Sequence, residues 1–231
     1  MKKTFKFMAL LGVCGALLLV AFGNKGSDNG STETAEWVDL GLPSGLLWAA
    51  CNLGASSPEE YGDYYAWGET TTKEVYDWST YKYCTVDAEG ELAMLTKYNT
   101  SSDYGTPDNL TTLEAMDDAA TQKLGSGARM PTADEWRELI DNTTAEWTTL
   151  NGVNGCKFTA SNGKSLFLPA AGYRWDGELL LAGEGGYYWS SSLHECNPDD
   201  AWYFYFHSGG QRMGYCNRYF GPSVRPVRSA R

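Results

Sequence analysis

The chain has 231 residues, with 29 acidic side chains against 18 lysines and arginines, so its formal net charge is −11 at pH 7. This balance disfavours binding to nucleic acid or to anionic lipid surfaces, since both would repel it. The six cysteines show no C-x-x-C pair and only two histidines are present, so neither a disulfide framework nor a zinc site is indicated.

The N-terminus has the pattern of an export signal, which we place at residues 1–22. Lys2, Lys3 and Lys6 precede an apolar run that is too short for an ordinary spanning helix but typical of a secretory signal. Phe22 stands where a lipoprotein leader has its acceptor cysteine, so ordinary cleavage and retention of the run as an anchor both stay open. We expect an exported protein of the cell envelope, the outer surface or the medium, which contacts membrane only through this leader.

A polar segment and then a folded domain follow the signal. Residues 23–36 are mostly small, polar or acidic and cannot bury enough apolar area to become ordered, so we predict a flexible tether. Residues 37–231 are long enough for one well-buried domain. It begins with two short strands in residues 37–48, around a Pro-Ser-Gly turn, and an extended aromatic piece at residues 64–68. Residues 77–109 form a long irregular loop, of a kind that is either functional or held by aromatic anchors.

Two capping boxes predict the helices of the domain. Thr111 and Glu114 form the first box, ahead of apolar residues at helical spacing, and Gly125 supplies the stop. Thr132 and Glu135 form the second box, before another apolar stripe. We expect the apolar residues of both helices to lie in the core.

The rest of the chain has the period of β-strands. Residues 201–206 carry an aromatic side chain at every position after the first, so one set can fill the core while the other needs a cover or a ligand. Two helices followed by several short antiparallel strands and long irregular loops indicate an α+β fold. The predicted strands are residues 156–160 and 166–168, joined by a two-residue Asn-Gly turn, and residues 187–191, 201–206 and 223–227.

Six strings of the domain resemble the Fibrobacter succinogenes major paralogous domain family, in that family's order. The strings are Val38-Asp-Leu-Gly-Leu-Pro-Ser-Gly-Leu-Leu-Trp48, Tyr61-Gly-Asp-Tyr-Tyr-Ala-Trp-Gly-Glu69, Arg129-Met-Pro-Thr-Ala-Asp-Glu-Trp136, Leu168-Pro-Ala-Ala-Gly-Tyr-Arg174, Tyr188-Trp-Ser-Ser191 and Ser223-Val-Arg-Pro-Val227. The resemblance implies a C-type-lectin-like fold over residues 37–231, related to that of formylglycine-generating and sulfatase-modifying proteins. It also implies an envelope or secreted protein of a Bacteroidota-type bacterium. Some relatives are variable proteins of diversity-generating retroelements, in which a C-terminal segment on this fold is hypermutated to vary ligand binding.

The last third of the domain holds more aromatic residues than a core requires. Large, rigid Tyr and Trp rings with one polar tip suit surfaces that bind proteins or sugars. We therefore expect a ligand-binding face within residues 174–184 and 194–221. Many residue types there can be reached from Asn codons by changes at adenines, so diversification of this segment is a further hypothesis. The residues expected to contact an unknown protein or glycan are Trp175, His194, Tyr203, Tyr205, His207, Gln211, Tyr215, Asn217 and Tyr219.

Two rival functions stand beside recognition. The resemblance to formylglycine-generating proteins implies a copper-thiol oxidase, for which Cys196 and Cys216 are the only candidates. A structural envelope or pilus-type subunit is the other rival. The string Glu195-Cys-Asn-Pro-Asp199 has the shape of a lectin calcium loop, but the Trp-Asn-Asp partner motif is absent, so we predict no metal, no cofactor and no catalytic residue. The neighbours Asp117 and Asp118 are expected to be solvated rather than to form an acid–base pair.

Overall fold

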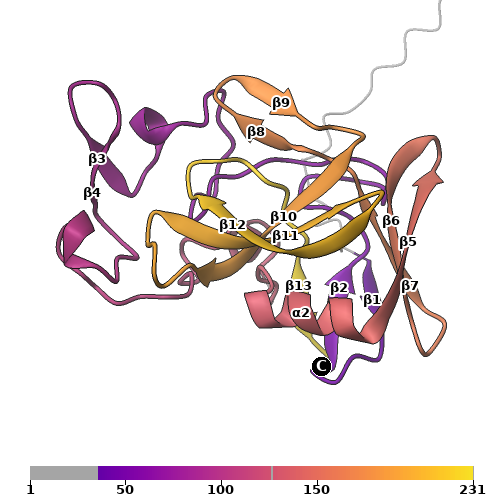
Figure 1. Ribbon diagram of the computed structural model, residues 1–231. Helices are drawn as coiled ribbons and strands as arrows, with labels where there is room; N and C mark the ends of the chain where they lie inside the picture. Colours follow the sequence, from indigo (N-terminus) through magenta and orange to yellow (C-terminus); the bar gives the residue numbers. More distant parts are fainter. Residues whose placement is uncertain (1–35, 126, 231) are drawn as a thin grey trace, which may run out of the picture. The chain divides into compact units, whose positions relative to one another are not determined.

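The computed structural model describes residues 36–125 and 127–230, so the predicted leader at residues 1–22 and nearly all of the predicted tether at residues 23–36 lie outside the described residues. The described part consists mostly of antiparallel strands with two helices, which confirms the predicted α+β class (Figure 1). Both of these helices are too short to span a lipid bilayer. The described residues belong to one structural unit.

Three three-stranded antiparallel sheets form most of this unit. The first, in the order β1-β2-β13, contains β1 (Trp37–Asp39), β2 (Leu46–Ala49) and β13 (Val227–Ser229). The second contains β5 (Thr143–Leu150), β6 (Val153–Ala160) and β7 (Ser165–Pro169). The third contains β10 (Gly185–Leu193), β11 (Asp200–His207) and β12 (Gly210–Asn217). Two hairpins complete the described strands, β3 (Cys84–Val86) with β4 (Leu92–Leu95) and β8 (Tyr173–Trp175) with β9 (Glu178–Leu180).

Strand β2 pairs with the strands at both ends of the domain. Trp48 lies opposite Val38 of β1 on one side and opposite Val227 of β13 on the other. This arrangement confirms the two strands predicted around the Pro-Ser-Gly turn. The strand predicted at residues 223–227 is only partly present, because β13 begins at its last residue and Pro226 has no N–H to donate to a ladder.

Helix α2 (Ala133–Asn142) begins at the predicted capping box. The Thr132 hydroxyl accepts a hydrogen bond from the Glu135 backbone N–H at 3.2 Å, and the Glu135 carboxylate accepts one from the Thr132 N–H at 2.8 Å. Trp136 and Leu139 of this helix are fully buried. Local capping and the apolar stripe therefore agree with the tertiary structure here.

The predicted start of the first helix is wrong, whereas its predicted end is correct. Helix α1 (Ala119–Leu124) begins after Asp118, whose carboxylate accepts from the Thr121 N–H at 3.0 Å, and it ends at Gly125. The segment before it is extended, because the Leu113 N–H donates to the carbonyl of Ser191 in β10. A tertiary hydrogen bond thus overrides the local capping signal at Thr111.

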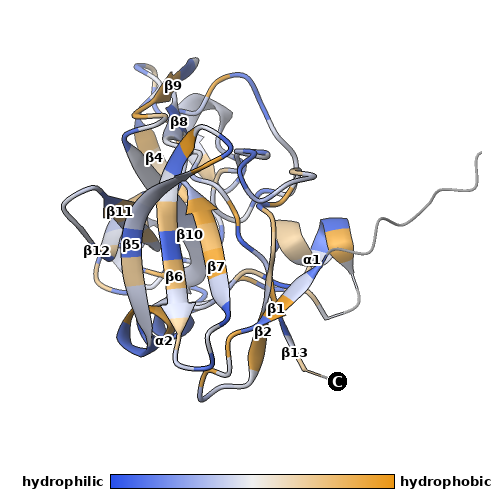
Figure 2. Cartoon of the chain, turned by 90° about the vertical axis from the view of Figure 1, so that its right-hand side faces the viewer, coloured by the Kyte–Doolittle hydropathy of each residue, from blue (hydrophilic) through white to orange (hydrophobic). Residues whose placement is uncertain are grey.

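The sheet β5-β6-β7 is only partly predicted from the sequence. Strand β5 follows α2 without a linker and is not predicted, although five of its eight residues are Thr or Trp, which favour strands. The hairpin of β6 and β7 is confirmed, and apolar and polar residues alternate along β6 (Figure 2). Its loop has three residues rather than two, because the Ala160 N–H donates to the Lys164 carbonyl and Gly163 adopts a φ of 79°.

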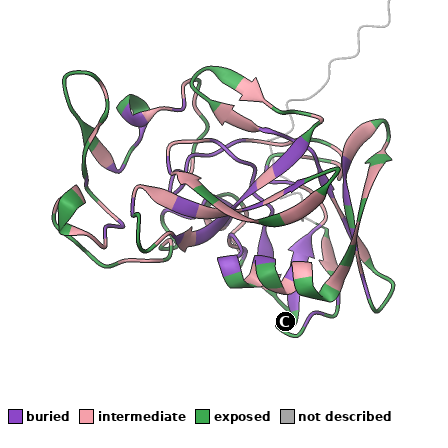
Figure 3. Ribbon diagram, in the orientation of Figure 1, coloured by how far each residue is buried: buried purple, intermediate pink, exposed green. Residues whose placement is uncertain are grey.

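Residues 77–109 are held by aromatic anchors, one of the two outcomes expected for this segment. It contains two short 3-10 helices, Trp78–Thr80 and Ser102–Tyr104, as well as the exposed hairpin of β3 and β4 (Figure 3). These elements and the chain between them send several buried side chains into the core. The aromatic anchors are Trp78, Tyr81, Tyr83 and Tyr98, and Leu95 of β4 is buried as well.

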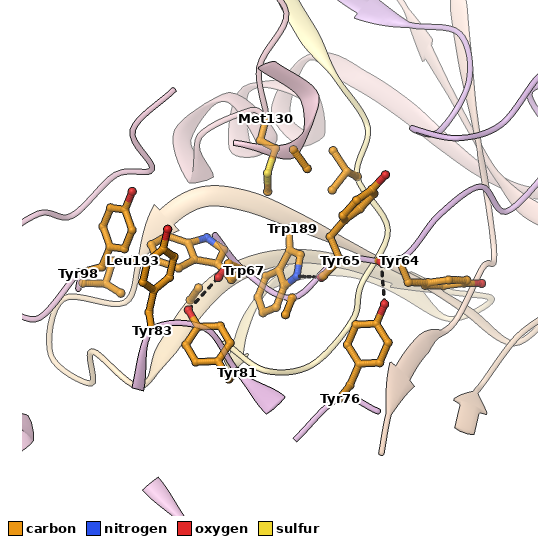
Figure 4. Packing of buried hydrophobic residues seen from close by; sticks show 14 of the residues in the cluster. Tyr64, Tyr65, Trp67, Tyr76, Tyr81, Tyr83, Tyr98, Met130, Trp189 and Leu193 are labelled. Atoms are coloured by element: carbon orange, nitrogen blue, oxygen red, sulfur yellow. Dashed lines mark hydrogen bonds between the residues drawn. The ribbon is translucent and has the colours of Figure 1, made fainter. Parts of the chain in front are cut away.

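Strand β10 is bonded by tryptophan indoles as well as by β11. Its register with β11 shifts between Trp189 and Leu193, and two backbone carbonyls of this stretch accept hydrogen bonds from indoles. The Trp67 indole donates to the Ser190 carbonyl at 2.8 Å, and the Trp136 indole donates to the Trp189 carbonyl at 3.1 Å. The Trp189 indole in turn donates to the Tyr65 carbonyl at 2.8 Å (Figure 4). These bonds satisfy polar groups that would otherwise be buried without partners.

Two hydrophobic clusters share β10 and β11 between them. One contains Trp67, Trp189 and all of the anchors named in residues 77–109. The other contains Trp48, Trp136 and the side chains of β11 that point toward α2. Because neighbouring residues of β10 enter different clusters, this strand lies between the two halves of the core.

Two arginines, Arg218 and Arg225, are buried among backbone carbonyls, and Arg218 donates to the carbonyl of Tyr98 at 2.8 Å. Arg225 donates to the Asn52 side chain at 3.0 Å, to the carbonyls of Ala49 and Ala50, and to the carbonyl of Phe167 at 3.1 Å. It therefore joins the end of β2 to β7. Within the described residues it has no carboxylate partner, so these neutral acceptors stabilise its charge.

Asp117 is buried, contrary to the expectation that it is solvated. Its carboxylate accepts hydrogen bonds from the hydroxyls of Tyr83 and Tyr98 and from the Lys97 ammonium, the last at 2.6 Å. Burial raises the pKa of Asp117, but the hydrogen bonds from Lys97, Tyr83 and Tyr98 outweigh burial and lower the pKa to about 2. Asp118 is also buried, as the N-cap of α1.

We expect Asp117→Asn to flatten the acid dependence of stability. The folded pKa lies below the value of about 3.9 for an unfolded aspartate, so the carboxylate stabilises the fold above pH 4 and this stabilisation is lost as the pH falls toward 2. Between pH 5 and pH 2, the free energy of unfolding measured with urea should fall by roughly 2 kcal/mol more in the parent chain than in Asp117→Asn. Asp103→Asn, at an exposed position, is the control, and equal losses in all three proteins would contradict this role of Asp117.

We expect Arg225→Lys to destabilise the fold by about 2–3 kcal/mol, because one ammonium cannot reach β2, Asn52 and Phe167 together and leaves buried acceptors without partners. Arg212→Lys makes the same chemical change at an exposed position and should leave the free energy of unfolding nearly unchanged. Urea denaturation of both variants measures the difference. Equal stabilities would show that the fork geometry of Arg225 is dispensable.

Candidate functional site: an aromatic strip on the central sheet

The sheet β10-β11-β12 separates the predicted site residues into two groups. Successive residues of a strand point to opposite faces, so the register decides which side chains share a face. On one face, Phe204 stacks on Trp136 of α2 with ring centroids 4.8 Å apart, and Phe206 is fully buried. The opposite face, which α2 does not cover, carries Tyr203 and Tyr205.

Tyr187 of β10 lies at the centre of the ring contacts on this uncovered face. Its ring centroid lies 4.7 Å from that of Tyr205, 5.8 Å from Tyr203 and 4.7 Å from Tyr173 of β8. Tyr205 in turn lies 5.3 Å from the exposed ring of His207. The four tyrosines are half-buried, so each ring is fixed by its neighbours and still reaches the surface.

The contacts continue beyond Tyr173 into the segment after β12. Phe220 lies 5.6 Å from Tyr173, 6.2 Å from Trp175 and 4.6 Å from Tyr219. Tyr219 packs against Trp78, 4.8 Å away, which ties this end to the core. We call these eight connected residues the aromatic strip: Tyr173, Trp175, Tyr187, Tyr203, Tyr205, His207, Tyr219 and Phe220.

Two hollows open along the aromatic strip, and Tyr187 lines both of them. The smaller hollow has a volume of about 220 Å³ and is lined by Tyr173, Tyr187, Tyr203, Cys216, Phe220 and Pro222. The larger has a volume of about 470 Å³ and is lined by Trp147, Leu181, Gly183, Glu184, Gly185, Tyr187, Tyr205, His207 and Ser208. Concave surface with aromatic walls and a few polar groups is typical of ligand sites.

The structure does not bring the nine predicted site residues together. Gln211, Tyr215 and Asn217 of β12 lie opposite Phe206, Trp202 and Asp200 in the register and therefore share the face that α2 covers. His194 belongs to the same side, because its ring contacts Trp202 and Tyr215. The aromatic strip contains the other five, Trp175, Tyr203, Tyr205, His207 and Tyr219.

The residues on the helix side form a smaller surface group. The His194 ring centroid lies 4.2 Å from that of Tyr215 and 5.0 Å from that of Trp202, and the Arg137 guanidinium of α2 lies 5.2 Å from the Trp202 ring. We call these four residues the helix-side cluster. Because Tyr215 is exposed, the helix-side cluster is a second aromatic surface of the same protein with which the aromatic strip can be compared.

Asn217 is engaged in a polar network beside the helix-side cluster. Its side-chain amide donates to Asp200 at 3.0 Å and to Asp199 at 3.3 Å. Burial, and then the nearby charge of Asp199, raise the pKa of Asp200 to about 6. With its donors used in this way, Asn217 holds the β11–β12 pair together rather than facing a ligand.

Sequence reasoning missed the middle of the aromatic strip. Tyr173 falls inside a string that resembles a family motif, and Tyr187 directly precedes another, so neither was among the residues expected to contact a ligand. Trp147 lies on the unpredicted β5, so its place beside the larger hollow could not be anticipated. Tyr187 shares a face with Tyr205 because the two are cross-strand neighbours, and no sequence signal gives this register.

The strip presents neutral phenols rather than charges. Burial raises the pKa of Tyr203 to about 12, and burial together with Tyr205 also raises the pKa of Tyr187. Each hydroxyl can therefore both donate and accept a hydrogen bond at neutral pH. No lysine or arginine is among the described residues that line either hollow, and Glu184 supplies the one carboxylate.

Cys196 and Cys216 have different environments. Both are free thiols; Cys196 is exposed in the turn after β10, whereas Cys216 lies on β12 and lines the smaller hollow. Burial, and then the charge of Asp200, raise the pKa of the Cys216 thiol well above its ordinary value. Copper binding requires thiolates, so this environment disfavours the role that the oxidase hypothesis gives Cys216.

Within residues 36–125 and 127–230, no three His, Cys, Asp or Glu side chains are grouped so that they could hold a metal ion. The string from Glu195 to Asp199, compared above with a calcium loop, forms a turn between β10 and β11. No family model, curated protein or solved structure matches the chain. What the aromatic strip can do therefore follows from its own chemistry.

We expect the cysteines to differ strongly in reactivity. Iodoacetamide at neutral pH should alkylate exposed Cys196 first, whereas Cys156 and Cys216 should resist, because burial raises the thiol pKa to about 11 at Cys156 and well above the ordinary value at Cys216. Peptide mass spectrometry of the folded protein over time measures the order. Rapid alkylation of Cys216 would instead support an activated thiol and revive the oxidase hypothesis.

Proposed function

We propose that this chain is an exported recognition protein that binds a protein or glycan ligand through the aromatic strip, on a C-type-lectin-like scaffold. The observation that carries the proposal is the unbroken series of ring contacts from Trp175 to His207 on the sheet face that α2 leaves uncovered. Aromatic rings fixed in this way offer large contact area and little conformational entropy to lose on binding.

The burial of the family-like strings supports the scaffold part of the proposal. Trp48, Trp67, Trp136 and Trp189 each come from one of these strings, and all four are fully buried. Arg225, from the last string, is buried as well. These strings thus supply much of the core, and apart from Tyr173 the aromatic strip consists of residues between and after them.

The leader and tether supply the argument for export. A basic start and an apolar run would carry the domain across a membrane, and where the run is retained as an anchor the polar spacer would hold the domain away from the surface. A recognition domain with an acidic net charge and an aromatic face suits that position. Diversification of residues 194–221 stays part of the hypothesis, since this segment supplies Tyr203, Tyr205, His207 and Tyr219 to the strip.

We expect Trp175→Ala to weaken ligand binding and Tyr215→Ala to leave it unchanged. The two side chains are 48% and 50% exposed, so neither substitution removes a core contact, but Trp175 belongs to the aromatic strip and Tyr215 to the helix-side cluster. Glycan and surface-protein arrays probed with the purified domain identify ligands, and titration of the variants measures the change. Loss of one exposed aromatic contact should weaken binding roughly tenfold.

The control also decides between surfaces. If Tyr215→Ala weakens binding and Trp175→Ala does not, the helix-side cluster is the ligand site and the strip proposal fails. If neither array gives a ligand and Trp175→Ala disturbs assembly of the cell envelope, the result supports the alternative that the chain is a structural envelope subunit. Replacing Cys196 and Cys216 by Ser should preserve binding, whereas a copper-thiol oxidase would lose its activity.

A further inference from the structure

The larger hollow of the aromatic strip combines residues of the predicted ligand-binding face with Trp147, which lies outside that face. Trp147 comes from β5, and Glu184 comes from the loop before β10. They face Tyr205 and His207 of β11 across a volume of about 470 Å³, within the range of about 300–1,000 Å³ usual for small-molecule sites. The hollow therefore lies where the sheets β5-β6-β7 and β10-β11-β12 meet.

Packing beneath the hollow fixes its aromatic wall. A Cβ on Gly186 would lie 2.2 Å from the Phe206 ring, so only glycine allows that ring to cross β10 here. Trp147 packs edge-to-face against Phe206 with centroids 6.3 Å apart. The indole is thus positioned by the core while the hollow exposes part of it.

The polar groups of the hollow include both donors and acceptors. His207 Nδ1 accepts a hydrogen bond from the Gly209 N–H at 3.0 Å, so the neutral ring carries its proton on Nε2 and offers it as a donor. The Glu184 carboxylate only accepts, whereas the hydroxyls of Tyr187, Tyr205 and Ser208 do both.

This inventory discriminates between ligand classes. An anion would be repelled by Glu184 and would find no lysine or arginine among the lining residues. A cation would pair with Glu184 but leave the His207 donor without an acceptor. The Arg212 guanidinium already lies over the Tyr205 ring, 5.6 Å from its centroid, so that ring already has a cation–π partner. A neutral polyhydroxy ring supplies donors and acceptors together, plus apolar C–H groups for Trp147.

We propose that this hollow binds one neutral saccharide unit without a metal ion, with Glu184 and His207 bonding its hydroxyls and Trp147 contacting its apolar face. The proposal rests on the proposed function in one respect, that the aromatic strip is the ligand face. It goes further by naming the chemical class of ligand and the subsite. Of the contributing residues, Trp147 lies outside the predicted ligand-binding face, whereas Leu181 and Glu184 lie within its range 174–184 but were not among the nine residues expected to contact a ligand.

The test uses the full chain labelled with ¹⁵N and follows the Trp147 indole resonance, which is assigned by its loss in Trp147→Phe. The probes are glucose, galactose, mannose and N-acetylglucosamine, with choline and glucuronate as cationic and anionic comparisons, all in the presence of a chelator. We expect at least one neutral sugar to shift this resonance and choline and glucuronate to do so more weakly. Glu184→Gln should weaken the binding of that sugar about tenfold, the effect of losing one charge-assisted hydrogen bond.

Glu146→Gln is the matched control, because Glu146 precedes Trp147 on β5, is exposed and points to the other face of the strand. It should leave the sugar affinity unchanged. The proposal is overturned if choline or glucuronate binds more tightly than every neutral sugar, if none of the sugars shifts the resonance, or if both glutamine variants behave alike.

The two proposals fail separately. If an array ligand depends on Trp175 while no sugar affects Trp147, the saccharide subsite is wrong and the strip remains the binding face. If a sugar binds the hollow in a Glu184-dependent way while Trp175→Ala leaves every ligand unaffected, the hollow stands and the wider strip is wrong.

Discussion

The indole hydrogen bonds to β10 are the constraint on which the arrangement of the domain depends. Where the register with β11 breaks, the carbonyls of Trp189 and Ser190 accept from Trp136 and Trp67, which come from distant parts of the chain. A buried carbonyl without a partner is costly, so the irregular strand and its tryptophans require each other. With α2 on one face of the central sheet, the opposite face is shared between the core cluster of Trp67 and Trp189 and the tyrosines of the aromatic strip.

The separation of the two faces changes the view of the C-terminal segment. As a sequence, residues 194–221 form one aromatic-rich region; in the fold, the same strands serve the core and α2 on one side and the aromatic strip on the other. Ligand binding can therefore be confined to the strip while the helix-side residues stabilise the sheet. The strip also gains members from β8 and β10, so the candidate surface is assembled from three separate segments.

Local signals predicted those parts of the structure in which local and tertiary preferences agree. The capping box at Thr132 marks α2 correctly, and alternation in residues 201–206 separates Tyr203 and Tyr205 from the core set. The box at Thr111 failed because a hydrogen bond to β10 takes precedence, and no local pattern could give the register that turns Tyr215 toward α2. The chemistry of a face assembled from distant strands becomes visible only with the pairing.

The hydrogen bonds that hold β10 and the two buried arginines in place have an evolutionary consequence. Their acceptors are mainly backbone carbonyls, which every residue type possesses, so these bonds depend on the identity of few side chains. Exposed side chains on the face of β11 and β12 that α2 does not cover, such as His207 and Arg212, can then change without loosening the framework beneath them. A domain built in this way tolerates exchange of its outward residues, and its surface can acquire new specificities while its interior stays the same.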